Sequence, residues 1–477
     1  RDQAVKAMDH ISPYIKESSP LVNMAKRLVS ADWFTAKVSV AGMSPVLYQV
    51  TQDDEFRFLY RDLCQDETPM VRRAAAIHLG RFLAQLTPNG VQEFQPILEQ
   101  LCRDHQDSVR LLAIASLGDL GPKLDPSWTS MVLLPIVKSG STDLSWRVRN
   151  NIAKSFSKVA ESLNLNDNYV PQKNLIMSCF ISLLQDQESE VRASAVRHLA
   201  PMIHWGGETL FVSHLQTLLP ALADDVAVEV RSKCALALMD ATEGGTLQDE
   251  TIVRSFTPLL ENFLHDEYSE VQLHVLSHLS RIAHLLNQMS GVVSSILNMS
   301  KVANWRVREG VGKLLPHLAE ARGIDFFSSV LMEPAWIPLL LDPVANVRLA
   351  CARSLQQLVR VAGDEWILSN LLPQHIQIYD QSATMYLVRM TILKAHAEMA
   401  CQSKSGPLFI QVVEQLLRGA KDSVPNVRMV AAQGLYEAIK VGDEAVVNGK
   451  VRPIVEQLIQ TETDPDSLQA LEMCSNV

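Results

Sequence analysis

Residues 66–79 read Asp-Glu-Thr-Pro-Met-Val-Arg-Arg-Ala-Ala-Ala-Ile-His-Leu. Thr68 offers an N-cap oxygen, and Pro69 follows at the first helical position, where a missing N–H costs nothing. Apolar residues then recur three and four positions apart, which is typical of an amphipathic helix. The small alanines allow another helix to approach closely. The stretch therefore predicts a helix that packs against a neighbour and begins at Pro69.

The same pattern, an aspartate followed five residues later by Val-Arg, returns along the chain at a spacing of about 39 residues. The aspartates and their valines are Asp66 and Val71, Asp104 and Val109, Asp143 and Val148, Asp186 and Val191, Asp225 and Val230, Asp266 and Val271, Asp342 and Val347, and Asp422 and Val427. Val307-Arg308 and Val388-Arg389 keep the pair without that aspartate, and Gln272 replaces the arginine after Val271. A period this regular indicates a repeat protein.

An apolar, helix-like stretch precedes each Val-Arg pair, and a second helix follows it. The first helix is expected to open near a proline, as at Pro96, Pro135, Pro220, Pro258 and Pro373. Ser189 and Ser269 are expected to cap second helices. Two antiparallel helices in about 39 residues predict an all-α fold, an α-solenoid (superhelix) of about twelve HEAT repeats.

The repeats are expected to be incomplete at the N-terminus. Residues 1–20 would hold only a second helix, and the opening at Arg1 without methionine suggests a fragment or a trimmed chain. The following repeats are expected to occupy residues 21–250, 251–287 and 288–477. The longer polar stretches at 164–168 and 244–250 are expected between repeats, with no linker separating domains.

Composition argues against several classes of partner. Lys and Arg number 43 against 53 Asp and Glu, a net charge of −10, so we expect no nucleic acid to bind. The sequence has no run of about 18 apolar residues, so we expect no membrane insertion. Seven cysteines without a Cys-x-x-Cys pair predict a reduced, intracellular protein, cytoplasmic and possibly also nuclear.

No motif for catalysis, cofactor or metal binding is found. His274 and His278 lie four residues apart, but they lack the glutamate of a helical zinc motif, so packing is the expected role. None of the 13 histidines is followed by glutamate, which argues against a repeat-built metalloenzyme. The sequence also lacks phosphate-binding glycine loops and a nucleophile motif. We expect a protein that is not an enzyme, with no cofactor and no metal.

The aspartate and arginine that return in every repeat are expected to have a structural role. They would form a ladder that bridges adjacent repeats and satisfies the amides of the turns. Function is expected instead where a slot varies, and the slot two residues before each valine holds large aromatics in two groups. Trp33 and Trp146 come early, and Trp305 and Tyr386 come late. They predict two partner zones, although each Trp could instead pack on the neighbouring repeat.

Several stretches resemble one family closely, namely residues 32–35, 66–76, 107–113, 145–149, 305–308 and 424–428. They look like the scaffold (A-type, or PR65) subunits of protein phosphatase 2A, and the resemblance covers essentially the whole chain. That family has fifteen repeats, of which the first two and the front helix of the third would be missing here. The last repeat departs from the family pattern at residues 463–468.

The resemblance implies a non-catalytic scaffold with two partners. The N-terminal repeats would bind a regulatory B-type subunit, and the last five would bind a Ser/Thr phosphatase catalytic subunit of the two-metal type. The implied regulatory-subunit contacts are Trp33, Phe34, Thr68, Pro69, Arg72, Arg73, Trp146 and Arg147. The implied catalytic-subunit contacts are Trp305, Arg306, Tyr386, Arg389, Val424 and Asn426. The alternative is a nuclear transport receptor of the importin-β type, which would need small-GTPase binding.

Overall fold

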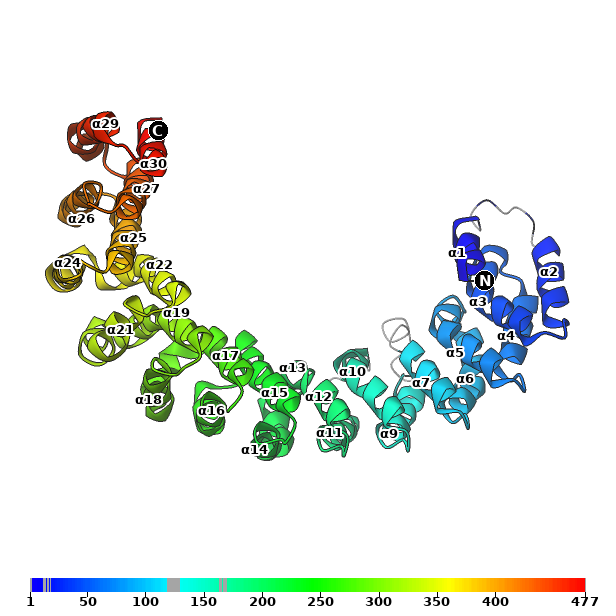
Figure 1. The fold of residues 1–477 in the computed structure, drawn as a ribbon. Helices are drawn as coiled ribbons and strands as arrows, with labels where there is room; N and C mark the ends of the chain where they lie inside the picture. The colour runs from blue at the N-terminus through cyan, green and yellow to red at the C-terminus, as the bar shows by residue number, and fades with distance from the viewer. Residues whose placement is uncertain are drawn as a thin grey trace. The chain divides into compact units, whose positions relative to one another are not determined.

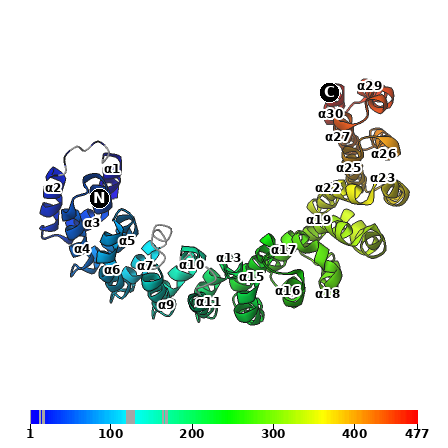
Figure 2. The same cartoon turned by 180° about the vertical axis from the view of Figure 1, so that it is seen from behind.

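The computed structural model describes residues 2–11, 14, 17, 19–117, 129–162, 165 and 170–476. These residues form helices and turns, with no strand among them. The chain divides into two compact units, unit 1 (Arg1–Gln248) and unit 2 (Asp249–Val477). Within each unit the helices follow one another as antiparallel pairs, and the second helices form a row of their own (Figures 1 and 2). The predicted all-α solenoid of HEAT repeats is confirmed.

Among its described residues, unit 1 begins with a single helix, α1 (Asp2–Ile11), and continues as six pairs. The pairs are α2 (Ser19–Val29) with α3 (Phe34–Thr51); α4 (Asp54–Cys64) with α5 (Pro69–Leu83); α6 (Pro88–Cys102) with α7 (Asp107–Leu117); η3 (Thr129–Leu133) and α9 (Leu134–Ser141) with α10 (Trp146–Ser162); α11 (Val170–Leu184) with α12 (Ser189–Val196) and α13 (Leu199–Leu210); and η4 (Phe211–Leu215), η5 (Gln216–Leu218) and α14 (Leu219–Ala223) with α15 (Val228–Ala241). A short turn of helix, η6 (Glu243–Gly245), closes the unit.

Unit 2 contains six further pairs. They are α16 (Asp249–Leu264) with α17 (Ser269–His278) and η7 (Leu279–Gln288); α18 (Ser290–Met299) with α19 (Trp305–Arg322); α20 (Ile324–Phe326), η8 (Phe327–Trp336) and α21 (Ile337–Leu340) with α22 (Ala345–Ala362); α23 (Asp364–Trp366), η9 (Ile367–Leu371) and α24 (Leu372–Gln381) with α25 (Tyr386–Ser403); α26 (Gly406–Gly419) with α27 (Pro425–Val441); and α28 (Glu444–Val446), η10 (Val447–Val451) and α29 (Arg452–Thr461) with α30 (Pro465–Ser475).

The repeated apolar positions form the core between neighbouring pairs. Val71 and Val307 are fully buried, as the motif valines are throughout except for the half-buried Val388. The cysteines at the equivalent positions of successive repeats, Cys64 and Cys102, are buried as predicted. Since each pair contacts its neighbours along the row, the fold is stabilised mainly by interfaces between adjacent repeats.

The expectation that prolines open the first helices is wrong at two places. Pro96 and Pro258 lie inside α6 and α16. At Pro135, Pro220 and Pro373 the α-helix does restart, but a π-helical segment precedes it, with a 3-10 turn in between before Pro220. Proline lacks an N–H and its ring clashes with the carbonyl four residues back, so the wider turn keeps the chain helical around it.

The capping predictions are only partly right. Thr68 is the N-cap of α5 and Pro69 its first residue, but the Thr68 side chain makes no capping bond. Ser189 and Ser269 are the first residues of their helices, not the caps, and the residues before them make no side-chain capping bond either. The ladder aspartates, described below, stabilise these turns instead.

Two further expectations concern the connections between repeats. The polar stretch 244–250 lies between α15 and the first turn of α16, as predicted. Most of the stretch 164–168 lies outside the described residues. The diverged last repeat still begins a regular helix, because the Asp464 side chain accepts a hydrogen bond from the Ser467 amide.

The two compact units divide after Gln248. The limits expected at residues 250 and 287 for the partner zones stay predictions.

Candidate partner-binding ridges

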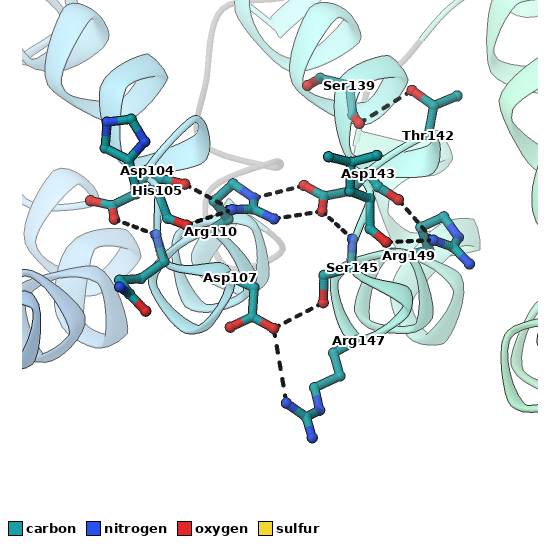
Figure 3. A network of polar contacts seen from close by, with 12 residues as sticks. Asp104, His105, Asp107, Arg110, Ser139, Thr142, Asp143, Ser145, Arg147 and Arg149 are labelled. Atoms are coloured by element: carbon teal, nitrogen blue, oxygen red, sulfur yellow. Dashed lines mark hydrogen bonds and ion pairs between the residues drawn. The ribbon is translucent and has the colours of Figure 1, made fainter.

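The turn inside most helix pairs is fixed by an arginine from the preceding repeat. Arg110 donates from Nε and Nη2 to the Asp143 carboxylate, at 2.7 Å each, and from Nη1 to the Asp104 carbonyl at 2.8 Å. The same carboxylate accepts the Ser145 amide at 2.8 Å, so it also closes the turn before α10 (Figure 3). Such charge-assisted, bidentate contacts are geometrically specific.

This arrangement, the arginine ladder, recurs in both units. Its other rungs are Arg72 with Asp104, Arg149 with Asp186, Arg192 with Asp225, Arg308 with Asp342, Arg389 with Asp422, and Arg428 with Glu462. Where the motif varies, a different polar group takes over. Gln272 donates to the Asp266 carbonyl at 2.7 Å, and the buried Arg348 donates to the Thr391 hydroxyl at 3.0 Å. The predicted ladder is therefore confirmed.

The ladder lowers the pKa of several of its carboxylates. Burial alone would raise the pKa of Asp422, but hydrogen bonds from Arg389 and the Val424 amide bring this pKa below its ordinary value. The hydrogen bonds of Arg428 lower the pKa of Glu462 to about 2 against the opposing effect of burial. These side chains are ionised at neutral pH, and the turns they fix project the neighbouring helix starts outward.

Residues at those turns and helix starts form a ridge on each unit. On unit 1, Trp33 is 75% exposed directly before α3, whose first residue is the exposed Phe34. The exposed Trp146 begins α10, and the Arg147 guanidinium lies 5.9 Å from the centre of its ring. Arg147 also lies 3.9 Å from Asp107 (Figure 3). The aromatic surface is therefore flanked by a positive charge that remains near solvent.

The turn before α5 supplies the remaining predicted contacts of unit 1. Pro69 and Arg73 are exposed, and Thr68 is half-buried. Arg72 is a rung of the ladder, bonded to Asp104 at 2.6 and 3.0 Å. Its contact with a partner stays a prediction, since what the structure shows is an arginine that fixes the turn carrying Pro69.

The ridge of unit 2 has a similar composition. Trp305 begins α19 and is half-buried, and the Arg306 guanidinium stacks 4.6 Å from the centre of its ring. Two pairs further on, Tyr386 is exposed at the start of α25. Val424, half-buried, caps α27, while Asn426 is exposed. Trp305 and Tyr386 are thus partly covered by protein but keep surface that a partner can contact.

Arg389 differs from the other residues predicted for the unit 2 ridge. It is only 4% exposed, and it donates to both Asp422 oxygens and to the Ser382 and Ala383 carbonyls. The structure therefore uses it as a rung. A direct contact with a partner stays a prediction for Arg389, whereas its role in holding the turn before α25 is visible.

Sequence reasoning missed several apolar residues on the ridges. Leu144 is 99% exposed and Val226 93% exposed, and each follows a ladder aspartate directly. Met385 and Leu387 are exposed on either side of Tyr386. An apolar residue immediately after the repeated aspartate was the signal that could have revealed the first two, because that position is solvent-exposed in every turn.

The residues considered in the sequence as metal ligands have other surroundings in the structure. No group of three or more His, Cys, Asp or Glu side chains that could hold a metal occurs among the described residues. His278, considered as a zinc ligand with His274, directs its Nδ1 to a carbonyl of its own helix at 2.8 Å. Within the part of the chain that the structure covers, no helix is long and apolar enough to cross a membrane.

Fold and ridges together define a class: an α-solenoid of HEAT type that presents aromatic and arginine side chains for protein contacts. Comparison with known proteins makes this specific. The chain is 31% identical over 297 residues to the beta isoform of the human 65 kDa A-type regulatory subunit of serine/threonine-protein phosphatase 2A, covering 58% of this chain and 47% of the relative. It is 29% identical over 170 residues to the A-type regulatory subunit of phosphatase PP2A from fission yeast (Schizosaccharomyces pombe), covering 34% and 29%.

A Drosophila melanogaster relative, the PP2A 65 kDa regulatory subunit, is 44% identical over 88 residues, 17% of this chain and 15% of that protein. The resemblance to the A-type regulatory subunits of phosphatase 2A is thus confirmed, over less than half the length of these relatives. No protein-family model matches the chain.

Solved structures show the same architecture in a different functional class. Importin beta matches with a TM-score of 0.67 at 15% identity, over 99% of this chain and 64% of that one. The karyopherin Kap121p matches with a TM-score of 0.68 at 14% identity, over 96% and 49%. At these identities the likeness concerns the fold alone.

Proposed function

We propose that the chain is a non-catalytic scaffold of a Ser/Thr phosphatase of the protein phosphatase 2A type. The ridge of unit 2 would hold the two-metal catalytic subunit through Trp305, Arg306, Tyr386, Val424 and Asn426. Arg389 would contribute indirectly, because it fixes the turn before α25. The ridge of unit 1 would hold a regulatory B-type subunit. The complex would work in the cytoplasm, with the nucleus as a second location.

One observation carries this proposal: aromatic side chains stacked with arginines occur at solvent-accessible helix starts on each unit. Trp146 with Arg147 and Trp305 with Arg306 are the pairs. Tryptophan and arginine contribute disproportionately to the free energy of protein association when a partner desolvates them. A solenoid with two such ridges can bind two proteins without contributing a reacting group. The names of the relatives, all phosphatase regulatory subunits, support the choice of partner.

The test is capture of the catalytic subunit. The double variant Trp305→Ala, Arg306→Ala is expected to weaken binding of a phosphatase 2A catalytic subunit by about 30- to 150-fold, the effect of losing about 2–3 kcal/mol at a hot spot. Pull-down followed by a phosphopeptide phosphatase assay would measure it. The matched control is Arg360→Ala, Lys440→Ala, which changes exposed cations in the last turns of α22 and α27, away from the ridge. Full binding by the Trp305 and Arg306 double variant would refute the assignment.

A nuclear transport receptor remains the second candidate, because solved importins share the fold. Their identity to this chain is about half that of the phosphatase subunits, so this likeness supports the solenoid and not the cargo. Recovery of a small GTPase in place of a phosphatase in the same pull-down would favour that alternative.

A further inference from the structure

Three consecutive second helices of unit 2 carry a cation at the same position, six residues after the motif valine. The cations are Lys313 on α19, Arg353 on α22 and Lys394 on α25. These three helices pack directly on one another. The equivalent positions on the helices to either side hold Ser277 and Gln433. The row is therefore bounded, and it stands out in a chain whose net charge is −10.

Two cations of the row, Lys313 and Arg353, line hollows between the second helices. One hollow of about 410 Å³ separates α17 from α19 and is lined by Leu273, Leu276 and Leu314 together with Arg306. The next hollow, of about 500 Å³, separates α19 from α22 and is lined by Leu349 and Arg353 among others. Glu309 and Lys313 line both hollows, so the two are neighbours on either side of α19, and together they are called the groove. Apolar and cationic side chains line the groove together, and Lys394 lies beyond it on α25.

The positive charges of the row are only partly balanced. Lys313 pairs with Glu309 at 2.7 Å. Arg353 is exposed and has no ion pair or hydrogen bond to any side chain that the structure describes. Glu398 lies close enough for the charge of Arg353 to act on it, and it also accepts a hydrogen bond from Gln356. Burial first, and then the charges of Arg353 and Arg348, lower the pKa of Lys394. Like charges are therefore held close together at a partly desolvated position, which an anionic ligand would relieve.

We propose that this groove, together with the row of cations that continues to Lys394, docks an extended acidic segment of a partner protein, with carboxylates spaced to meet Lys313, Arg353 and Lys394. This docking surface lies on the helix faces, and it meets the ridge of unit 2 at Trp305 and Arg306, which both line the first hollow. The proposal does not depend on whether the ridges bind a phosphatase.

The spacing of the row favours an extended chain. Packed helices lie about 8–10 Å apart. In a polyproline II segment, residues three apart point the same way and are separated by about 9.3 Å. An acidic residue at every third position would therefore meet one cation per helix. Lysines, which supply two of the three charges, act as point charges, while a phosphate is best held by convergent arginines, so carboxylates fit this row better.

The binding test uses the full chain and a synthetic probe. Fluorescein-labelled (Glu-Pro-Pro)4 is titrated with the protein, and anisotropy gives the dissociation constant at two salt concentrations. The triple variant Lys313→Gln, Arg353→Gln, Lys394→Gln is expected to weaken binding about tenfold, since each exposed ion pair contributes about 0.5 kcal/mol. Added salt should weaken binding to the unmodified chain and change little for the triple variant.

The controls separate this groove from general electrostatics. The variant Lys301→Gln, Lys421→Gln, Lys450→Gln changes the net charge equally at sites outside the groove, and it should bind as the unmodified chain does. Circular dichroism should show the same helical content for both variants, because the substituted side chains are not fully buried. Equal weakening by the two variants would overturn the proposal. Equal binding of (Gln-Pro-Pro)4, or a probe that does not bind the unmodified chain, would do so as well.

Discussion

At the scale of single residues, the ladder arginine explains why the repeated motif is retained. Arg389 crosslinks two repeats through Asp422 and also satisfies two turn carbonyls. Its replacement removes the cation bonded to the largely buried Asp422 carboxylate, which keeps donors from Tyr379 and the Val424 amide, and leaves two carbonyls without this donor. We expect Arg389→Gln to lower the free energy of unfolding by about 2–3 kcal/mol at pH 7, measured by urea denaturation. Arg418→Gln, which breaks the exposed pair with Asp380, should change it by less than about 1 kcal/mol.

The same ion pair, Arg389 with Asp422, predicts that the free energy of unfolding depends on pH. The folded-state pKa of Asp422 is lower than its ordinary 3.8, so the rung stabilises fully above that ordinary value. The contribution is lost as the pH falls through the lower folded-state pKa. The difference between the unmodified chain and Arg389→Gln should therefore shrink below about pH 4. A difference that stays constant into strong acid would contradict the ionic origin of the effect.

Two buried histidines make the stability of unit 2 depend on pH in a less acidic range than the ladder does. His375 and His396 are fully buried, their rings stack 5.8 Å apart, and within the described structure none of their nitrogens has a hydrogen-bond partner. Burial lowers the pKa of His375 from 6.5 to about 4 and that of His396 as well. Protons therefore bind the unfolded chain first, and stability falls as the pH drops from 6.5 toward 4.

Denaturation at pH 7.5 and pH 5.0 tests the histidine pair. We expect His375 alone to account for a loss of about 2 kcal/mol at the lower pH, since 1.4 kcal/mol corresponds to one pKa unit. The variant His375→Leu, His396→Leu should lose much less over the same interval. If its pH dependence matches that of the unmodified chain, the acid sensitivity has another source.

At the scale of helices, the periodic pattern of the sequence predicted the features that every repeat shares. It did not predict the segments in which the backbone departs from an α-helix. The motif around Val71 gave the helix start at Pro69 and the ladder, because a buried valine and a crosslinking arginine are needed in each repeat. The π-helical segments before Pro135 and Pro373 were not predictable in this way. A wide turn depends on which carbonyl the proline ring meets, and the apolar pattern carries no such information.

Close helix packing supplies a prediction at the same scale. A Cβ atom on Gly442, directly after α27, would lie 2.1 Å from Phe409 Cζ and 2.7 Å from the Ala438 carbonyl oxygen. Because backbone and a buried ring cannot both move away, Gly442→Ala should lower the free energy of unfolding by about 1–3 kcal/mol. Gly449, in η10 of the same repeat, has open space around its Cβ direction. Gly449→Ala should therefore leave stability unchanged or raise it slightly, as thermal unfolding would show.

At the scale of the whole molecule, the sequence located both ridges but not all of their surface. Trp33 and Trp146 were predictable because they interrupt a slot that is otherwise small or polar. Leu144 and Val226 were missed because a single apolar residue in a polar turn has no periodic partner. Arg72 and Arg389 satisfied the family pattern, yet only the structure shows that their guanidinium groups are engaged within the chain.

The division of the ridges between two compact units predicts that the two partners can be lost separately. Trp146→Ala, Arg147→Ala removes an exposed stacked pair from unit 1, where the ladder of unit 2 is untouched. We expect this variant to lose a B-type regulatory subunit while it still captures the phosphatase catalytic subunit. The variant Trp305→Ala, Arg306→Ala should do the opposite: it should lose the catalytic subunit and still bind the B-type regulatory subunit. Co-purification of each variant with both recombinant partners measures this, because separate contact surfaces give additive losses when they share no residues. Simultaneous loss of both partners from either folded variant would mean that the two ridges do not act as independent binding surfaces.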